Sequence, residues 1–150
     1  MKKKIIAVIG AGNADGHLLA VAEEVGRLIA LNGAILVCGG LGGVMEAAAK
    51  GAKSGGGLTV GILPGFEKGD ANPHIDVPIA TGLREGRNVL IVRSSDALIA
   101  VGGEYGTLSE IALSLKTGKT VIGIGTWDIK GIIRATSAEE AVKKALEPHH

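Results

Sequence analysis

Two glycine-rich turns, residues 39–43 (GGLGG) and 102–107 (GGEYGT), contain the residue types with the clearest chemical use in this chain. Each turn follows a short apolar run and precedes a helical pattern. A strand that ends in glycines at a helix N-terminus leaves backbone N–H groups unpaired, and these groups bind anions together with the positive end of the helix dipole. Two such turns predict a ligand that carries phosphate, held at the carboxyl edge of a parallel sheet.

A third glycine turn, Gly10-Ala11-Gly12-Asn13, follows the first apolar run. It does not complete a classical dinucleotide-binding fingerprint, because the next glycine, Gly16, comes one residue late. That fold also needs an acidic residue at the end of the second strand, and the segment here ends in Cys38 and two glycines. The Gly-Lys-Ser/Thr sequence of nucleotide triphosphatases is absent as well. For Gly42 and Gly43, close approach of a helix to the sheet is the alternative explanation.

Glu110 has two interpretations, which are compatible. Thr107 and Glu110 fit a capping box, in which Glu110 would accept a hydrogen bond from the Thr107 backbone N–H and contribute on the order of 1 kcal/mol. Alternatively, Glu110 faces a bound ligand together with Arg87 from the preceding helix. A carboxylate beside a ribose C1′ stabilises an oxocarbenium-like centre or orients a water, and an arginine clamps phosphate or sugar.

The elements that must position these groups alternate along the chain. Strand-like runs cover residues 4–9, 35–38, 58–63, 97–101 and 120–124, with shorter candidates at 75–80 and 132–133. Helical patterns cover residues 18–32, 44–53, 83–91, 108–116 and 138–146, the last opened by the capping sequence that starts at Ser137. Residues 66–78 predict a loop over the strand ends. The alternation predicts an α/β, doubly wound, mostly parallel sheet of six to seven strands with helices on both faces, in one domain over residues 1–150.

Composition excludes several classes of function. The net charge of +1 and the three aromatic residues argue against a nucleic-acid surface, and no apolar run reaches the ~18 residues of a membrane span. The single cysteine, Cys38, is typical of a reducing cytoplasm, so we expect a cytoplasmic protein. His17 and His74 are isolated, so no metal site is predicted. The terminal pair 149–150 is compatible with the remnant of an expression tag and is given no weight.

Three segments carry a resemblance to a known family: residues 38–45 (CGGLGGVM), 57–65 (GLTVGILPG) and 102–110 (GGEYGTLSE), with Arg87-Asn88 and Ser95-Asp96-Ala97 between the last two. In this order they resemble the superfamily of LOG-type proteins over nearly the whole chain. Its members include cytokinin-activating nucleoside-monophosphate phosphoribohydrolases and molybdenum cofactor carrier proteins.

The resemblance implies a Rossmann-like fold, assembly into a homo-oligomer such as a dimer or tetramer, and a phosphorylated nucleotide- or pterin-like ligand. That ligand would be a nucleoside monophosphate or a molybdopterin-type cofactor. Together with the glycine turns described above, the resemblance predicts the following ligand-binding residues: Gly10, Gly12, Asn13, Gly39, Gly40, Gly42, Gly43, Met45, Gly103, Gly106 and Thr107.

Within the superfamily this sequence is closer to the carrier branch. The hydrolase motif is Pro-Gly-Gly-x-Gly-Thr-x-x-Glu with an Arg-Lys pair upstream. In this sequence Gly102 replaces the proline of that motif, Glu104 replaces a phosphate-facing glycine, and Asn88 replaces the lysine. Arg87 and Glu110 match the catalytic arginine and glutamate of the hydrolases. We therefore expect a binding or carrier protein. The alternative is a nucleoside 5′-monophosphate phosphoribohydrolase, in which Arg87 and Glu110 would be catalytic.

Overall fold

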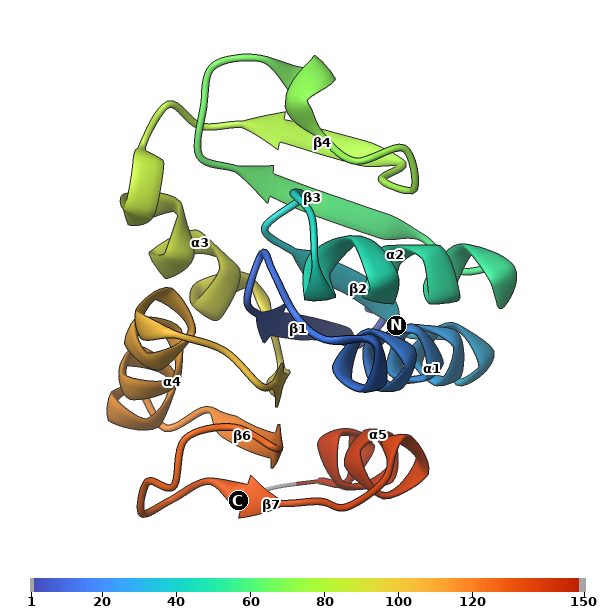
Figure 1. Cartoon of the computed structure of the whole chain (residues 1–150), viewed down its shortest axis with the longest axis vertical. Helices are drawn as coiled ribbons and strands as arrows, with labels where there is room; N and C mark the ends of the chain where they lie inside the picture. Colours follow the sequence, from blue (N-terminus) through green and yellow to red (C-terminus); the bar gives the residue numbers. More distant parts are fainter. Residues whose placement is uncertain (1, 149–150) are drawn as a thin grey trace.

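The computed structural model describes residues 2–148 and contains a seven-stranded, fully parallel sheet (Figure 1). The strand order is β4-β3-β2-β1-β5-β6-β7. The strands are β1 (Ile5–Gly10), β2 (Ile35–Cys38), β3 (Thr59–Leu63), β4 (Val77–Ala80), β5 (Ala97–Val101), β6 (Thr120–Ile124) and β7 (Ile133–Arg134). The predicted Rossmann-like α/β fold is confirmed. The two C-terminal histidines interpreted above lie outside the described residues.

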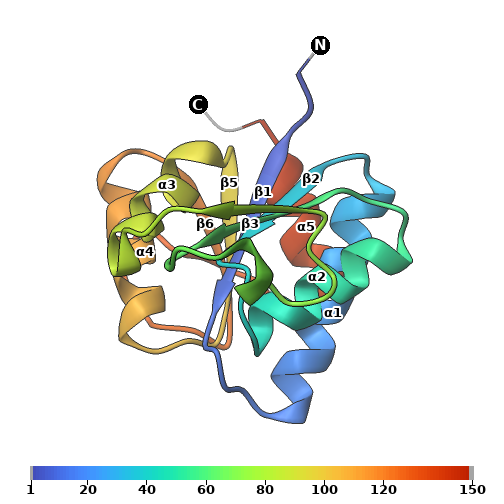
Figure 2. The same cartoon turned by 90° about the horizontal axis from the view of Figure 1, so that it is seen from above.

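Helices cover both faces of this sheet (Figure 2). On one face lie α1 (Gly16–Leu31), α2 (Val44–Ser54) and α5 (Ala138–Leu146); on the other lie α3 (Arg87–Ser94) and α4 (Tyr105–Lys116). The inner strands are nearly continuous apolar runs of Ile, Val, Leu and Ala, because a parallel sheet covered on both sides buries both of their faces. In β5, for example, all five residues are buried. In the edge strand β4, by contrast, Val77 and Ile79 are exposed.

Helices α1 and α2 pack against each other unusually closely. A Cβ added at Gly26 of α1 would lie 1.9 Å from the Ala48 carbonyl oxygen, and one at Gly51 of α2 would lie 1.8 Å from the Glu23 carbonyl oxygen. Each glycine therefore admits the backbone of the other helix. This contact fixes α2, and with it the turn that precedes α2, against α1.

Two helix starts show where local patterns hold and where they fail. At α5 the predicted cap is confirmed: the Ser137 hydroxyl accepts from the Glu140 N–H at 3.1 Å, and the Glu140 carboxylate accepts from the Thr136 N–H at 2.8 Å. At α4 the predicted cap is wrong. The helix begins at Tyr105 with Glu104 at the N-cap, so Thr107 lies within the first turn and Glu110 within the second.

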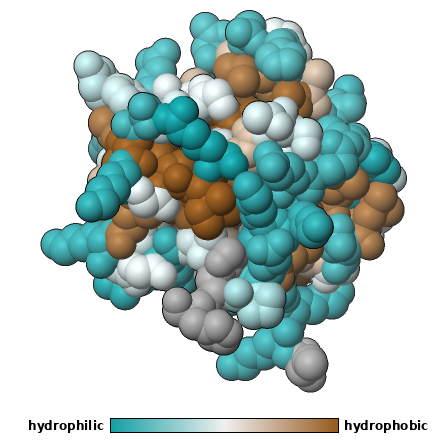
Figure 3. Space-filling model, turned by 90° about the horizontal axis from the view of Figure 1, so that it is seen from below, coloured by the Kyte–Doolittle hydropathy of each residue, from teal (hydrophilic) through white to brown (hydrophobic). Residues whose placement is uncertain are grey.

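Two other segments also differ from their predicted patterns. The segment predicted as a loop over residues 66–78 contains a short 3-10 helix (Lys68–Asp70) and leads into β4. The helix predicted over residues 83–91 is a 3-10 turn (Arg84–Gly86) followed by α3. Within the described range, no helix combines the length and apolar character needed to cross a bilayer. Figure 3 views the molecule from the β7 side, where apolar areas are separated by hydrophilic side chains.

Candidate functional site

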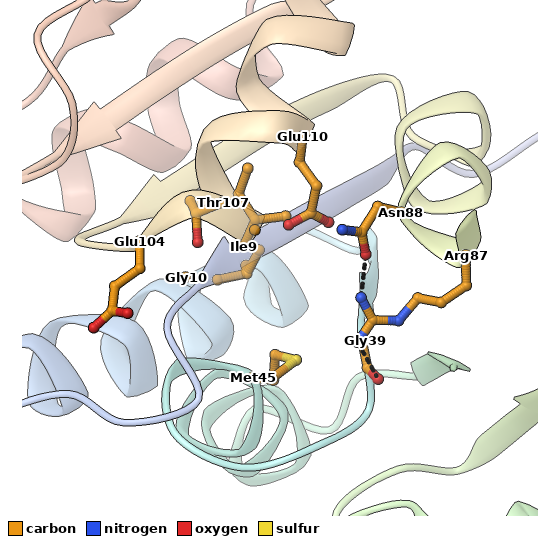
Figure 4. Close-up of a pocket in the computed structure, with 11 residues that line it drawn as sticks. Ile9, Gly10, Gly39, Met45, Arg87, Asn88, Glu104, Thr107 and Glu110 are labelled. Atoms are coloured by element: carbon orange, nitrogen blue, oxygen red, sulfur yellow. Dashed lines mark hydrogen bonds between the residues drawn. The ribbon is translucent and has the colours of Figure 1, made fainter. Parts of the chain in front are cut away.

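The sheet reverses its strand order between β1 and β5, and a cavity opens near the carboxyl ends of these two strands. Its volume is about 120 Å³. Figure 4 shows its walls, which come from β1, the turns after β2 and β5, and the starts of α2, α3 and α4. The lining residues are Val8, Ile9, Gly10, Gly39, Met45, Arg87, Asn88, Glu104, Gly106, Thr107 and Glu110.

Not all of the predicted glycines line this cavity. Gly10, Gly39 and Gly106 do, together with Met45 and Thr107. The others, Gly12, Asn13, Gly40, Gly42, Gly43 and Gly103, are not among its lining residues.

Two of the glycines outside the cavity, Gly40 and Gly43, have close structural contacts. A Cβ at Gly43 would lie 2.4 Å from the Ala11 carbonyl oxygen, and the Val44 N–H donates to that oxygen at 3.1 Å. The close-approach explanation therefore applies to Gly43. The Gly40 carbonyl oxygen accepts from the Asn72 N–H at 2.9 Å, which ties the turn after β2 to the loop before β4.

The first turn of α4 supplies N–H groups to the cavity wall. In the described part of the chain, no hydrogen bond is recorded for the backbone N–H of Gly106 or Thr107, and both residues line the cavity. Backbone N–H groups at the start of a helix are free because no preceding turn accepts from them. Together with the helix dipole, they favour an anion at this place.

The segment after β6 holds the carbonyl groups of the β5–α4 turn. The Thr126 hydroxyl donates to the Gly102 carbonyl oxygen at 2.5 Å, and the Trp127 indole N–H donates to the Glu104 carbonyl oxygen at 3.2 Å. The Gly102 N–H donates to the Ile124 carbonyl oxygen at 3.0 Å. With φ at +60°, Gly102 has a backbone that proline, fixed near −65°, does not adopt. The turn is therefore built differently from a proline-containing one.

Arg87 lies at the start of α3 and reaches across to the turn after β2. Its guanidinium donates to the Asn88 side-chain oxygen, and Nη2 lies 3.5 Å from the Gly39 carbonyl oxygen (Figure 4). The Nε atom is buried and has no hydrogen-bond partner among residues 2–148. Burial lowers the pKa of the guanidinium from its ordinary value, and the nearby Glu110 opposes that effect. One donor of Arg87 therefore has no partner within the described chain, and the residue itself lines the cavity.

Glu110 is 6% exposed, and no hydrogen bond to its carboxylate is recorded within the described chain. Figure 4 shows the carboxylate directed toward the Asn88 amide, and not back to Thr107 as the capping box required. Burial raises the pKa of Glu110 to about 7, although the positive charge of Arg87 acts in the opposite direction. A carboxyl group with this pKa exchanges a proton near neutral pH.

Glu104 and Cys38 have different environments. The Glu104 side chain is exposed and in Figure 4 points away from Arg87 and Glu110. Its carboxylate therefore does not occupy the centre of the cavity. The Cys38 thiol is buried and accepts from the Gly40 N–H at 3.4 Å, and burial raises its pKa to about 11. Cys38 is thus a neutral core residue.

A second, larger hollow of about 490 Å³ adjoins the cavity. Arg87, Asn88 and Gly106 line both spaces. The larger hollow is completed by Pro64, Gly65, Phe66, Arg84 and Glu85.

Asn88 was not predicted from the sequence as a site residue in its own right, and Thr126 and Trp127 were not predicted at all. The side chain of Asn88 is 9% exposed and accepts from Arg87. Its position next to Arg87 was a usable signal, since a buried amide beside an arginine needs a partner. The side chains of Thr126 and Trp127 donate hydrogen bonds to backbone carbonyl groups of the β5–α4 turn, and no pattern in the sequence indicates such contacts.

Comparison with known proteins gives a consistent result. The family model described as "SLOG cluster4 family" matches residues 3–150. A protein of Archaeoglobus fulgidus is 57% identical over 147 residues, 97% of either chain. A cytokinin riboside 5′-monophosphate phosphoribohydrolase of Mycobacterium tuberculosis is 38% identical over 105 residues, which are 67% of this chain and 56% of the relative.

Two solved structures are similar over nearly their full length. The molybdenum cofactor binding protein of Rippkaea orientalis has a TM-score of 0.91 and 40% identity, covering 96% of both chains. The molybdenum cofactor carrier protein of Chlamydomonas reinhardtii has a TM-score of 0.88 and 38% identity, covering 97% of this chain and 99% of that one.

Proposed function

Because the chain belongs to the SLOG cluster4 family, we propose that it is a binding or carrier protein for a phosphorylated, pterin- or nucleotide-like small molecule, of the molybdenum cofactor carrier type. The observation that carries this proposal is the cavity at the β1–β5 reversal, where the free N–H groups of Gly106 and Thr107 lie near Arg87. The full-length similarity to molybdenum cofactor binding and carrier proteins supports the same ligand class.

The dimensions of the site fit such a ligand. The cavity of about 120 Å³ is small, and three of its lining residues are glycines, which lets backbone amides approach a phosphate group. The adjoining hollow of about 490 Å³ falls within the roughly 300–1,000 Å³ of pockets that hold whole small molecules. A phosphate would therefore be bound by the first turn of α4 and by Arg87, while the rest of the molecule extends outward.

Thermal unfolding with and without ligand tests the proposal. Guanosine or adenosine monophosphate, or a molybdopterin-type ligand, should raise the melting temperature at millimolar concentration, because a ligand that binds only the native state stabilises it by mass action. Native mass spectrometry of freshly purified protein would report a co-purified ligand and the predicted homo-oligomer together. No shift with any of these ligands would contradict the proposal.

The second candidate is a phosphoribohydrolase, and one observation favours it: Arg87 and Glu110 line the same cavity. Glu110, with its pKa near 7, would act as the proton-exchanging carboxyl group beside the ribose, and Arg87 would hold the phosphate or sugar. The relative from Mycobacterium tuberculosis supports this candidate. Against it stand Asn88 in place of the lysine and the positive φ of Gly102 in place of the proline.

Incubation with adenosine monophosphate and detection of free adenine separates the two candidates. A carrier binds the nucleotide and releases it intact, so no adenine should accumulate above the rate of a heat-denatured control. If adenine does form, Glu110→Gln should abolish its release, and unchanged turnover in that variant would remove Glu110 from the mechanism.

A further inference from the structure

The hollow beside the cavity has an exposed aromatic side chain in its wall. Phe66 is 79% exposed, although the chain has only three aromatic residues. Its ring lies over Gly82: a Cβ added there would come within 2.6 Å of the Phe66 Cε1 atom. The Gly82 N–H donates to the Gly65 carbonyl oxygen at 2.8 Å. One edge of the ring therefore lies against Gly82, while most of the side chain is exposed to solvent.

An unusual backbone conformation places a positive charge at the same hollow. Arg84 has φ of +53° and is the one non-glycine residue with positive φ among residues 2–148. Its N–H donates to the Pro64 carbonyl oxygen at 2.9 Å, which fixes the 3-10 turn against the segment after β3. Left-handed backbone at a residue with a side chain is unfavourable and recurs at ligand sites. Its side chain is exposed, and in this part of the chain no ion pair is recorded for it.

The hollow adjoins the cavity, because Arg87, Asn88 and Gly106 line both spaces. One molecule can thus place its phosphate in the cavity and its remainder in the hollow. A solvent-facing aromatic ring beside a guanidinium recognises flat, electron-rich rings by stacking, and the guanidinium adds contacts to carbonyl or anionic substituents. Glu85, which also lines the hollow, can accept from ring amino groups.

We propose that this hollow is the ring subsite, in which Phe66 stacks on the planar heterocycle of the phosphorylated ligand and Arg84 contacts the ring's oxygen or anionic substituents. The subsite rests on the proposed function for its phosphate anchor. It would select ligands that carry a flat, amino- and oxo-substituted bicyclic ring, such as a pterin or a guanine, over aliphatic phosphates.

Calorimetric titration with guanosine monophosphate and with inorganic phosphate tests the subsite. The wild-type protein should bind the nucleotide more tightly than phosphate. Phe66→Ala should weaken nucleotide binding about tenfold, the usual effect of removing one stacking partner, and leave phosphate binding unchanged. Phe66→Tyr should bind like the wild type. Arg84→Gln should also weaken nucleotide binding and leave phosphate binding unchanged.

Two control variants match these changes. Leu31→Ala removes another exposed apolar side chain, 58% exposed, at the end of α1. Arg93→Gln removes an exposed arginine from α3 that does not line either space. Neither should alter nucleotide binding.

The outcomes distinguish the two proposals. If the wild type binds guanosine monophosphate and phosphate equally, or if Phe66→Ala binds the nucleotide normally, the ring subsite is wrong while the phosphate site stands. If the wild type binds neither, both fail. A change of oligomer mass in Phe66→Ala with unaltered nucleotide affinity would mean that Phe66 contacts a second copy of the chain, which also overturns the subsite.

Discussion

The guanidinium of Arg87 lies against the backbone of Gly39, and the space between them has no room for a methyl group. A Cβ at Gly39 would come within 2.6 Å of Arg87 Nη2 and 2.7 Å of the Met45 sulfur. Gly39 therefore sets the position of the arginine. This contact joins the turn after β2 to the start of α3, two segments that are 48 residues apart in sequence.

Gly39→Ala should displace Arg87 and weaken the binding of a phosphorylated ligand. Charge-assisted hydrogen bonds contribute about 1.5–3 kcal/mol, so we expect about a tenfold to hundredfold loss of affinity by calorimetry. Gly69→Ala, at an exposed glycine with open space around its Cα, should bind normally. Normal affinity in Gly39→Ala would show that Arg87 does not hold the anion.

Glu110 should make stability depend on pH. Its pKa is about 7 in the folded protein, against 4.5 as the ordinary value, so the folded state holds this proton more tightly than the unfolded state. The free energy of unfolding should therefore fall as pH rises from about 4.5 to about 7, by roughly 3 kcal/mol from this group.

Glu110→Gln isolates that contribution, because glutamine has the same shape and no charge. The free energy of unfolding of each protein is measured with urea at about pH 5 and at about pH 8. The value for the variant, relative to that of the wild type, should be higher at pH 8 than at pH 5. A difference between the two proteins that stays constant over this range would contradict the raised pKa.

Thr126→Val should loosen the turn before α4. The substitution keeps the methyl group that packs at Gly123 and removes the hydrogen bond to the Gly102 carbonyl oxygen. We expect a loss of about 1 kcal/mol in the free energy of unfolding and severalfold weaker ligand binding. The fluorescence of Trp127, the chain's one tryptophan, should change as well, since its ring lies 5.9 Å from that of Tyr105 at the same turn. Unchanged binding would mean that the turn is held without this bond.

Gly26→Ala should destabilise the protein although alanine is the better helix former. Its Cβ would overlap the Ala48 carbonyl group, and overpacking of this kind costs about 1–3 kcal/mol or more. Gly16→Ala, in the first turn of the same helix with nothing within 4 Å, should be neutral or slightly stabilising. Equal melting temperatures for the two variants would contradict the close packing of α1 on α2.

The sequence was sufficient to predict the fold because its patterns are local. Apolar runs, glycine turns and the cap at Ser137 each depend on neighbours in the chain, and the structure confirms the resulting alternation of strands and helices. The convergence of the turns after β1, β2 and β5 also followed from a general property of parallel sheets, whose carboxyl ends meet at one edge.

The errors occur where distant segments decide the local structure. Thr107 and Glu110 have capping-box spacing, yet α4 begins earlier, with the Glu104 carbonyl oxygen accepting from the Leu108 N–H. Trp127, which is distant in the sequence, donates to the same carbonyl oxygen. The position of Gly43, packed on the turn after β1 and outside the lining of the cavity, likewise depends on a contact between segments that are distant in the sequence. Neither contact has a signal in the nearby sequence.

The left-handed backbone of Gly102 separates this chain from proteins with a proline at the corresponding position. Proline there would demand a different φ and would remove the N–H that reaches Ile124. A proline at this position therefore requires the main chain of the β5–α4 turn to move as well, so the residue type and the path of the backbone have to change together.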